Sequence, residues 1–239
     1  MEDFRFRQFT ISHQRSTLKV GTDALILGVL TRLTGIEKLI LDVGAGCGVI
    51  ALMLAQRSPA VIDAIEIDEQ SALEAGSNFN RSPWSDRLNS IHTSFQDYSG
   101  SCNKQYDLIV SNPPFFQNCL LPQEKKSGLA KHNQQLGFDE FLSCTVNPLS
   151  ADGSLAVILP VAESEVFIGK AAEHGLFLYG STQINPIENK PANRKVLHFS
   201  RKISAAQEFQ EITLRDKSGK FTEAYKTLTG EFHPEEYFR

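Results

Sequence analysis

Short apolar runs alternate with longer stretches of helical spacing along most of this 239-residue chain. A short apolar run bounded by turn residues favours a buried strand, and the stretch after it favours a helix. Strands that alternate with helices predict a parallel sheet covered on both faces. The predicted strands are 39–43, 61–66, 88–92, 106–110, 153–160, 176–184 and 196–200. The predicted helices begin at Thr22, Val49, Glu69, Gly137 and Glu163, and a short one lies within 221–238.

The two ends of the chain show different patterns. Apolar residues alternate with polar ones between Phe4 and Ile11, which predicts a half-buried strand or a hairpin. Towards the other end, the runs 176–184 and 196–200 flank a loop and predict an antiparallel pair at the end of the sheet. Thr22 is expected to cap the helix that follows it, because its hydroxyl can accept from a free backbone N–H, and a helix N-terminus that faces a ligand is the alternative explanation of Thr22 and Asp23.

We expect a single domain, because no internal repeat or low-complexity linker divides the chain. The order of elements predicts an α/β, Rossmann-like fold with a seven-stranded, mostly parallel sheet. One antiparallel strand is expected near the edge of this sheet, with helices on both faces. The domain would span residues 1–239, with an amino-terminal arm over 1–21 and a carboxyl-terminal extension over 204–239.

Composition limits the classes of protein to consider. The chain is 41% apolar and 22% charged, which is ordinary for a soluble globular protein. No apolar run approaches the ~20 residues of a membrane span, and the amino terminus lacks the apolar core of a signal peptide. The four cysteines are widely spaced, so neither a zinc site nor a disulfide framework is expected. These features predict a cytoplasmic protein that binds no membrane and no metal.

Basic residues gather in three segments, although the formal net charge is −4. Acidity argues against a general coat for nucleic acid but allows a local basic patch. On composition alone a solvated surface is the favoured interpretation, and a phosphate-contacting surface is the alternative. The candidate phosphate contacts are Arg5, Arg7, Arg15, Lys125, Lys126, Lys131, Lys190, Arg194 and Lys195. We hypothesise that the segments 5–19, 125–132 and 190–202 converge on one face.

A glycine-rich turn, 44–48, joins the predicted strand 39–43 to a helix. Strand, glycine turn and helix form the first half of a nucleotide-binding unit, because glycines let the backbone approach a ligand closely. The spacing is Gly-x-Gly-x-Gly, so the dinucleotide fingerprint is not met. Asp42 would repel a phosphate, but it could accept from a cationic amino group or lie near a sulfonium. The glycine candidates for ligand binding are Gly44, Gly46 and Gly48.

Two acidic residues follow the next strands. Glu66 ends the strand 61–66 about 20 residues after the turn, where a carboxylate accepts from a ribose diol. Asp68 is the competing residue, but it is better placed to cap the helix that begins at Glu69. Asp97 is expected in a polar loop, and only the order of the motifs favours it as an acceptor from the amino group of an adenine.

Asn112-Pro113-Pro114-Phe115 follows a predicted strand, 106–110, which two consecutive prolines must end. Asn112 carries a carbonyl acceptor and an amide donor, so it can hold a planar amine by its edge. The prolines stiffen the backbone and leave carbonyl acceptors, and Phe115 offers a flat face for stacking. In isolation this tetrapeptide is as compatible with a strand-ending turn as with a site.

Taken together, the glycine turn, the acids and Asn-Pro-Pro-Phe resemble class I S-adenosylmethionine-dependent methyltransferases that act on exocyclic or amide nitrogens. In that group the Asn-Pro-Pro-aromatic motif binds the target nitrogen. Further stretches resemble the family of tRNA(Val) adenine methyltransferases, which modify an adenine beside the anticodon, although that family often carries Tyr at the position of Phe115. Those stretches are Phe6–Ile11, Lys19–Asp23, Ser82–Trp84, Glu223–Tyr225 and Leu228–Thr229.

The resemblance implies S-adenosylmethionine as cofactor, a valine tRNA as partner and no obligate protein partner. It implies cofactor contacts from Lys19, Gly21, Thr22, Asp42, Gly44, Gly46, Gly48, Glu66, Asp97 and Asn112. The catalytic set would be Asn112, Pro113, Pro114 and Phe115. The alternatives are a ribosomal RNA guanine methyltransferase, a protein glutamine methyltransferase and, in another class, a non-catalytic nucleotide-binding module.

Overall fold

A computed structural model describes residues 3–16, 19–113, 137–205 and 207–238. Within these residues the main sheet has eight strands, and a two-stranded hairpin lies apart from it. The strands are β1 (Phe4–Arg5), β2 (Thr10–Ile11), β3 (Leu39–Val43), β4 (Val61–Glu66), β5 (Leu88–His92), β6 (Tyr106–Ser111), β7 (Leu149–Pro160), β8 (Phe177–Asn185), β9 (Arg194–Ser200) and β10 (Glu208–Thr213). The helices are α1 (Thr22–Leu30), α2 (Val49–Arg57), α3 (Glu69–Asn80), α4 (Phe95–Ser101), α5 (Phe138–Val146), α6 (Val161–Glu173), α7 (Glu223–Thr229) and the 3-10 helix η2 (Glu235–Phe238).

The strand order in the main sheet is β10-β8-β9-β7-β6-β3-β4-β5. β9 runs antiparallel to both of its neighbours, and the other neighbouring pairs are parallel. The Rossmann-like sheet with one antiparallel strand is therefore confirmed, but the expected number of seven strands is wrong. The eighth strand, β10, comes from the carboxyl-terminal extension. Its side chains at the sheet edge are mostly exposed, so the apolar alternation that marks a strand is missing there.

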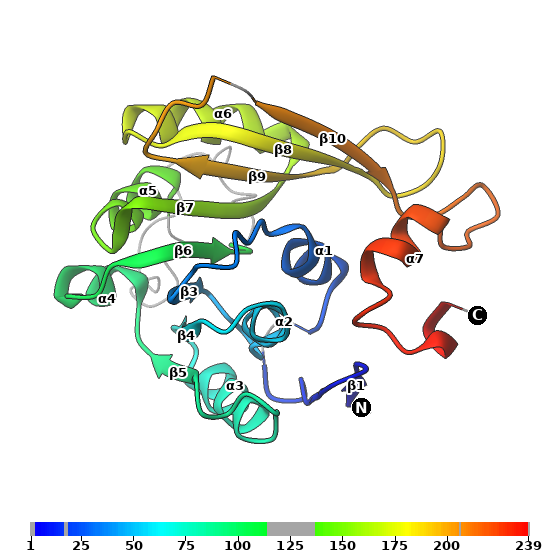
Figure 1. Cartoon of the computed structure of the whole chain (residues 1–239), viewed down its shortest axis with the longest axis horizontal. Coiled ribbons are helices and arrows are strands. Elements are labelled where there is room, and N and C mark those ends of the chain that lie inside the picture. Colours follow the sequence, from blue (N-terminus) through cyan, green and yellow to red (C-terminus); the bar gives the residue numbers. More distant parts are fainter. Residues whose placement is uncertain (1–2, 17–18, 114–136, 206, 239) are drawn as a thin grey trace, which may run out of the picture.

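The central strands place alternate side chains on opposite faces of the sheet. Ile40 of β3 and Leu108 of β6 belong to one buried cluster, together with α1, α2 and the aromatic side chains of the tail. Leu41 and Ile109, one position along the same strands, belong to the other cluster with residues of α5 and α6. Figure 1 shows α1, α2 and α7 on one side of the sheet and α4, α5 and α6 on the other. Each buried Leu or Ile stabilises the fold by about 1.5–3 kcal/mol.

The two ends of the chain meet on the α1 side of the sheet (Figure 1). The predicted hairpin is confirmed, because β1 and β2 pair in antiparallel register. The backbone N–H of Arg7 donates to the Phe232 carbonyl at 2.8 Å, and its side-chain Nε donates to the His233 carbonyl at 2.9 Å. The His233 ring stacks on Tyr237 with a centroid distance of 3.7 Å. The arm and the tail thus form one joined surface.

Two local predictions about helix starts are wrong. α1 begins at Thr22, but Gly21 occupies the N-cap position, and no side chain caps the helix. Asp97 lies in the first turn of α4 rather than in a polar loop. Ser94 caps α4 and accepts from the Asp97 backbone N–H, while Asp97 Oδ2 accepts from the Ser94 hydroxyl at 2.7 Å. The Ser94 cap starts a helix where polar composition alone suggests a loop.

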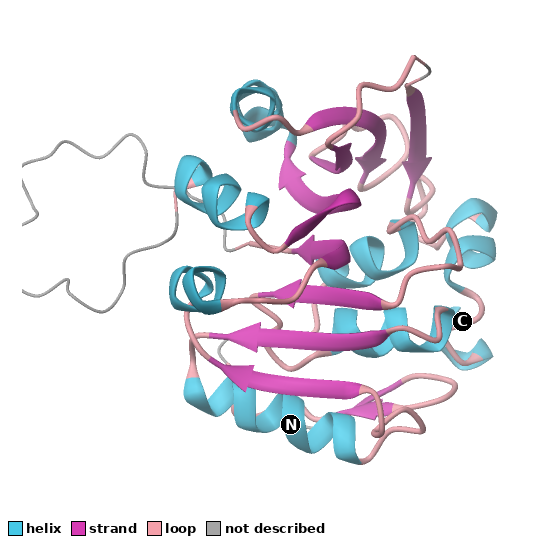
Figure 2. Cartoon of the chain, turned by 60° about the vertical axis from the view of Figure 1, so that its left-hand side comes forward, coloured by secondary structure: helices cyan, strands magenta, loops and turns pink. Residues whose placement is uncertain are grey.

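The parallel strands end at a common edge, towards which their arrowheads point in Figure 2. Ligands of open α/β sheets bind at the carboxyl ends of the strands, so this edge is where the predicted site should lie. In the described residues no helix is long and apolar enough to cross a membrane.

Candidate active site

Three neighbouring strands end in register at the carboxyl edge of the sheet. Val43 of β3 pairs with Ile65 of β4 and with Ser111 of β6, and the Ser111 hydroxyl donates to the Val43 carbonyl at 2.8 Å. Neighbouring strands lie about 4.8 Å apart, so the residues that follow this row are also neighbours. Those residues are Gly44, Glu66 and Asn112. The register brings together the glycine loop, the acid at the end of β4 and the Asn-Pro-Pro-Phe motif.

The glycine loop has the backbone conformation that its sequence predicts. Gly44, Gly46 and Gly48 have φ angles of 72°, 56° and 85°, in the left-handed region that favours glycine. A Cβ on Gly44 would have no heavy atom within 4 Å, whereas one on Gly48 would lie 2.4 Å from the Phe79 ring. Gly44 therefore leaves room for a ligand, and Gly48 is also required for packing of α2 against α3.

Glu66 braces the glycine loop. Its Oε2 accepts from the Gly46 N–H at 2.8 Å, and its Oε1 accepts from the Asp68 N–H at 2.9 Å. Asp68 caps α3 by accepting from the Ser71 N–H at 2.8 Å, so the prediction that Asp68 is the capping residue is confirmed. Each carboxylate oxygen of Glu66 has a second lone pair, so this half-buried side chain can still accept from a diol.

Asp42 lies beneath the loop and is fully buried. Its Oδ2 accepts from the Ala51 N–H at 3.1 Å, and its Oδ1 has no hydrogen-bond partner in the described part of the chain. Burial raises the pKa of Asp42 to about 7, the Ala51 N–H lowers it, and the charge of Glu66 raises it further. A buried carboxylate with a free oxygen favours a cation or a donor nearby.

The amino-terminal arm is fastened over α3 beside the glycine loop. Glu74 of α3 accepts from the backbone N–H groups of Gln14, Arg15 and Ser16 at distances between 2.7 and 3.2 Å. Burial raises the pKa of Glu74, but these N–H groups outweigh it and hold the pKa below its usual range. Ser16 is 3% exposed, and its hydroxyl would lie 3.6 Å from a Cβ on Gly46. Within the described residues this hydroxyl has no partner.

Lys19, Gly21 and Thr22 connect the arm to α1. The Lys19 ammonium donates to the carbonyls of His13, Gln14 and Ser16, so it braces the arm. Gly21 and Thr22 are exposed at the first turn of α1. Their predicted contacts with a cofactor remain predictions. The same holds for Asp97, whose exposed carboxylate lies on α4 and is engaged with Ser94.

Asn112 and Pro113 are the two motif residues that the structure describes. Asn112 is half-buried directly after β6, and Pro113 is buried. The Asn112 amide makes no hydrogen bond with any described residue, and it lies at the edge beside Gly44. Pro114 and Phe115 lie outside the described residues.

Known proteins are similar to this chain over most of its length. A family model described as the methyltransferase small domain matches residues 12–159. A protein of Trichodesmium erythraeum named tRNA1(Val) (adenine(37)-N6)-methyltransferase is 42% identical, covering 96% of this chain and 97% of that one. A protein of the same name from Edwardsiella ictaluri is 36% identical, covering 96% and 93%. This chain belongs to the tRNA1(Val) (adenine(37)-N6)-methyltransferase family.

Solved methyltransferase structures share the fold of this family member. A predicted O-methyltransferase of Agrobacterium tumefaciens has a TM-score of 0.66 at 19% identity, covering 87% of this chain and 96% of that one. A methyltransferase of Pyrococcus furiosus has a TM-score of 0.60 at 20% identity, covering 82% and 90%. Identities this low bear on fold alone, and they confirm the predicted class I methyltransferase fold.

The basic residues of the arm lie beside α3. Arg5 and Arg7 line a surface hollow of about 330 Å³ together with Arg81, which follows α3. Arg15 is exposed on the segment that Glu74 holds. Three cations in a lining whose described residues include no acidic one would suit a phosphate, so Arg81 adds a candidate that sequence analysis missed.

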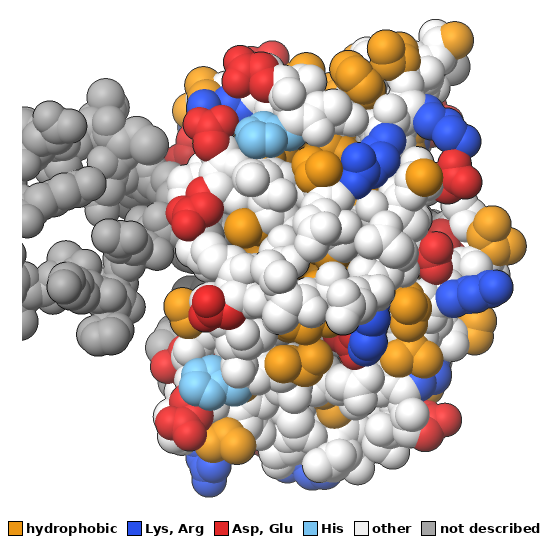
Figure 3. All heavy atoms as spheres, turned by 90° about the vertical axis from the view of Figure 1, so that its left-hand side faces the viewer, with side chains coloured by type: hydrophobic (Ala, Val, Ile, Leu, Met, Phe, Trp, Pro, Cys, Tyr) orange, Lys and Arg blue, Asp and Glu red, His pale blue; other side chains and the backbone are white. Residues whose placement is uncertain are grey.

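The basic residues near β9 have acidic partners. Arg194 pairs with Asp23 at 2.9 Å, and Lys195 pairs with Glu165 at 2.8 Å, whereas Lys190 is exposed. The face in Figure 3 shows basic and acidic side chains interspersed. Lys125, Lys126 and Lys131 lie outside the described residues. Convergence of the three basic segments therefore stays a hypothesis.

Sequence analysis missed two residues beside the glycine loop. Ser16 contributes a buried hydroxyl, and Glu74 holds the arm that carries it. Glu74 lies within a helix, where a Glu is ordinarily solvent-exposed, so its type gave no signal. Ser16 belongs to a polar stretch without periodicity. Both depend on a contact between segments about 60 residues apart, for which no local pattern exists.

Proposed function

We propose that this protein transfers a methyl group from S-adenosylmethionine to the exocyclic N6 amine of adenine 37 in tRNA1(Val). The names of relatives that cover almost the whole chain support the substrate. The structural observation that carries the proposal is the pairing of Val43 with Ser111. It sets Asn112, which can hold a planar amine, beside Gly44 of the cofactor loop.

The residues present at the sheet edge fit S-adenosylmethionine. Gly44 is exposed with open space where a side chain would lie, whereas Gly46 is buried under Ser16, and both have φ angles in the left-handed region that favours glycine. The unpartnered Oδ1 of Asp42 and hydroxyl of Ser16 are buried polar atoms beside this loop that lack a described partner. Glu66 would accept from the ribose hydroxyls. When bound, the cofactor supplies an electrophilic methyl carbon on a sulfonium.

The role of Asn112 follows from the electronic structure of the target. The lone pair of an aromatic exocyclic amine is delocalised into the ring, so the amine is a weak nucleophile. Oδ1 of Asn112 and the carbonyl of Pro113 would each accept one N–H of the amine and turn the nitrogen towards tetrahedral geometry. Its lone pair then points at the methyl group. This is catalysis by position and by fixed dipoles, which requires no side-chain base.

The target base must leave its stack to reach Asn112. An anticodon-loop nucleotide is unpaired, so its extrusion costs less than extrusion from a duplex. Phe115, whose position in the motif is known from sequence alone, is proposed to stack on the extruded adenine. A stacked aromatic ring stabilises an extruded base by about 1–3 kcal/mol.

The test is methyl transfer from labelled S-adenosylmethionine to separate pools of unmodified tRNA, ribosomal RNA, DNA and protein extract. We expect label in N6-methyladenosine of tRNA1(Val) and none in the other pools. A matched tRNA1(Val) with guanine at position 37 should accept no label. Label in ribosomal guanine or in protein glutamine would overturn the substrate, and absence of transfer to every pool would overturn the activity.

A further inference from the structure

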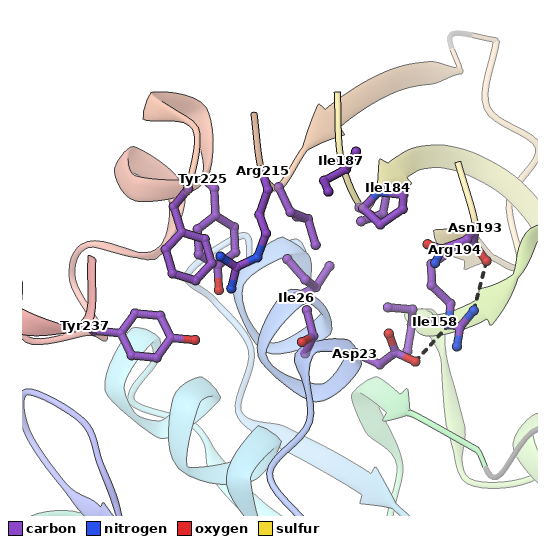
Figure 4. Close-up of a pocket in the computed structure, with 14 residues that line it drawn as sticks. Asp23, Ile26, Ile158, Ile184, Ile187, Asn193, Arg194, Arg215, Tyr225 and Tyr237 are labelled. Carbon is purple, nitrogen blue, oxygen red and sulfur yellow. Dashed lines mark hydrogen bonds and ion pairs between the residues drawn. The ribbon is translucent and has the colours of Figure 1, made fainter. Parts of the chain in front are cut away.

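A pocket of about 380 Å³ lies beside the candidate active site, between α1, the sheet and the carboxyl-terminal extension. This volume falls in the range of pockets that hold small ligands. Figure 4 shows its walls, with Arg215 and Tyr225 on one side and Ile184 and Ile187 on the other. Thr22 is the one residue of the predicted cofactor set that lines it, so cofactor binding does not account for most of this pocket.

The pocket opens at the same edge of the sheet as Asn112. Ser111 of β6 pairs with Val157 of β7, and Ile158, the next residue, lines the pocket. Arg194 pairs with Pro160 across β7 and β9 and forms an ion pair with Asp23 at 2.9 Å. That ion pair belongs to the pocket wall as well. β9 lies two strands from β6, and Arg194 lies three residues beyond Leu197, which is level with Ser111, so the Arg194 part of the wall is about 14 Å from the end of β6.

The chemistry of the walls is divided. Ile26, Ile158 and Ile184 are buried and provide an apolar floor. Arg215 is exposed, and its guanidinium lies 4.0 Å from the centroid of the Phe221 ring. A guanidinium that is backed by an aromatic ring has one face covered and the other face able to stack on a base. A positive charge beside flat surfaces is the combination that binds single-stranded nucleic acid.

We propose that this pocket binds a second RNA base, that of a nucleotide next to the target adenine. The inference rests on the proposed function for the target and extends it to a specificity site. The base would stack on Arg215 over the apolar floor, and its edge would face Asp23 and Asn193. Asp23 disfavours a phosphate at that end, so the phosphate of this nucleotide lies towards Arg215. Two splayed neighbouring bases can reach Asn112 and the pocket together.

Two variants test the pocket, and one serves as a matched control. Arg215→Gln removes the stacking cation, and Ile187→Trp fills the space from a half-buried loop position. Lys217→Gln makes the same loss of charge two residues away, on an exposed side chain that does not line the pocket. Each protein is assayed for methyl transfer to tRNA, for cofactor affinity and for melting temperature.

We expect both pocket variants to raise the KM for tRNA about tenfold, the loss that follows from one missing base stack. The kcat at saturating tRNA, the cofactor affinity and the melting temperature should match those of Lys217→Gln. Substrate RNAs with an abasic nucleotide on either side of the target locate the bound base. One of them should lose about tenfold in kcat/KM with the wild-type protein and nothing further with Ile187→Trp.

Two results would overturn the assignment. One is an Ile187→Trp variant with wild-type kcat/KM on tRNA. The other is an Ile187→Trp variant whose kcat/KM falls by about a further tenfold when the substrate RNA is abasic, because independent losses would mean that the base does not occupy the pocket. If the wild-type protein methylates no tRNA, the proposed function fails, and binding of a single-stranded oligoribonucleotide still tests the pocket. Equal oligonucleotide affinity of wild type and Ile187→Trp would then overturn the pocket as an RNA site. The same conclusion would follow if Ile187→Trp lost affinity for a peptide substrate and kept its affinity for the oligonucleotide.

Discussion

The two halves of the site are built differently. The proposed cofactor half comes mostly from one stretch of chain, Asp42 to Asp68, to which the arm adds Ser16 beside Gly46. The proposed substrate half comes from segments that are distant in sequence, with Asp23, Asn112 and Arg194 at the same sheet edge. A contiguous motif fixes a shared cofactor, and dispersed segments allow specificity to vary.

The two halves also differ in how their side chains are held. The cofactor half is braced by backbone donors, since Glu66 accepts from the N–H groups of Gly46 and Asp68. The substrate half presents side chains with spare capacity, such as the Asn112 amide. Changes in the first half should therefore alter cofactor affinity, and changes in the second should alter transfer or RNA binding without altering it.

The largest expected effect belongs to Asn112→Ala. Loss of the acceptor that orients the target amine should lower kcat by about 100-fold or more. The Kd for S-adenosylmethionine, measured by calorimetry, should stay within twofold of wild type, because the cofactor half of the site is unchanged. Asn103→Ala, an exposed amide at the opposite end of β6, is the matched control and should retain full activity. An active Asn112→Ala protein would remove the proposed catalytic role.

Glu66→Gln should give the next largest effect. The substitution replaces a carboxylate by a neutral amide with a single acceptor oxygen. Because the carboxylate accepts from Gly46 and is proposed to hold the ribose, we expect the Kd for S-adenosylmethionine to rise about tenfold. The KM for tRNA should not change. Glu69→Gln, an exposed acid three positions along, provides the comparison. If Glu66→Gln instead raised the KM for tRNA with cofactor affinity intact, the division of the site into two halves would be wrong.

The two halves of the site also differ in how well their residues could be predicted from the sequence. Gly44–Gly48 and Glu66 were found from spacing, because strand, turn and helix are adjacent in sequence. The helical position of Asp97 was missed, since a loop and a capped helix start have similar composition. β10 was missed because its side chains are exposed at an edge. Ser16, Arg81 and Arg215 depend on how distant segments pack, and no local pattern carries that information.

Asp42 gives the cofactor half a pH dependence. Its pKa is about 7 in the folded protein, against about 3.9 in an unfolded chain. Between these values the folded state holds a proton that the unfolded state has lost, so this group's contribution to stability decreases as pH rises from about 4 to 7. The melting temperature should show this decline in the unliganded wild type and not in Asp42→Asn.

Cofactor binding should show the opposite trend. A sulfonium favours the ionised carboxylate, so S-adenosylmethionine should bind up to about tenfold more tightly at pH 8 than at pH 6. Asp42→Asn, measured by calorimetry at both values, should bind weakly and show no such dependence. A wild-type affinity that does not vary with pH would place Asp42 away from the cationic part of the cofactor.

The smallest expected effect concerns Arg81, which lines the hollow with Arg5 and Arg7. Arg81→Gln should weaken tRNA binding about two- to threefold near physiological salt. The slope of log affinity against log salt concentration should fall by about 0.7–0.9, the value for one phosphate contact. Lys202→Gln, which removes an exposed charge near β9 that pairs with Asp152, should leave the slope unchanged. Equal slopes for wild type and Arg81→Gln would exclude the hollow from RNA contact.

The tie between Arg7 and the tail has a consequence for how this protein matures. Arg7 and His233 are 226 positions apart, and their bond holds the arm whose next residues lie over the glycine loop. During synthesis the contact between Arg7 and His233 forms late, because the tail leaves the ribosome after every strand of the sheet. The proposed cofactor pocket is therefore among the last parts of the molecule to be completed. A nascent chain that stops before the tail would carry the whole methyltransferase sheet without a secured arm.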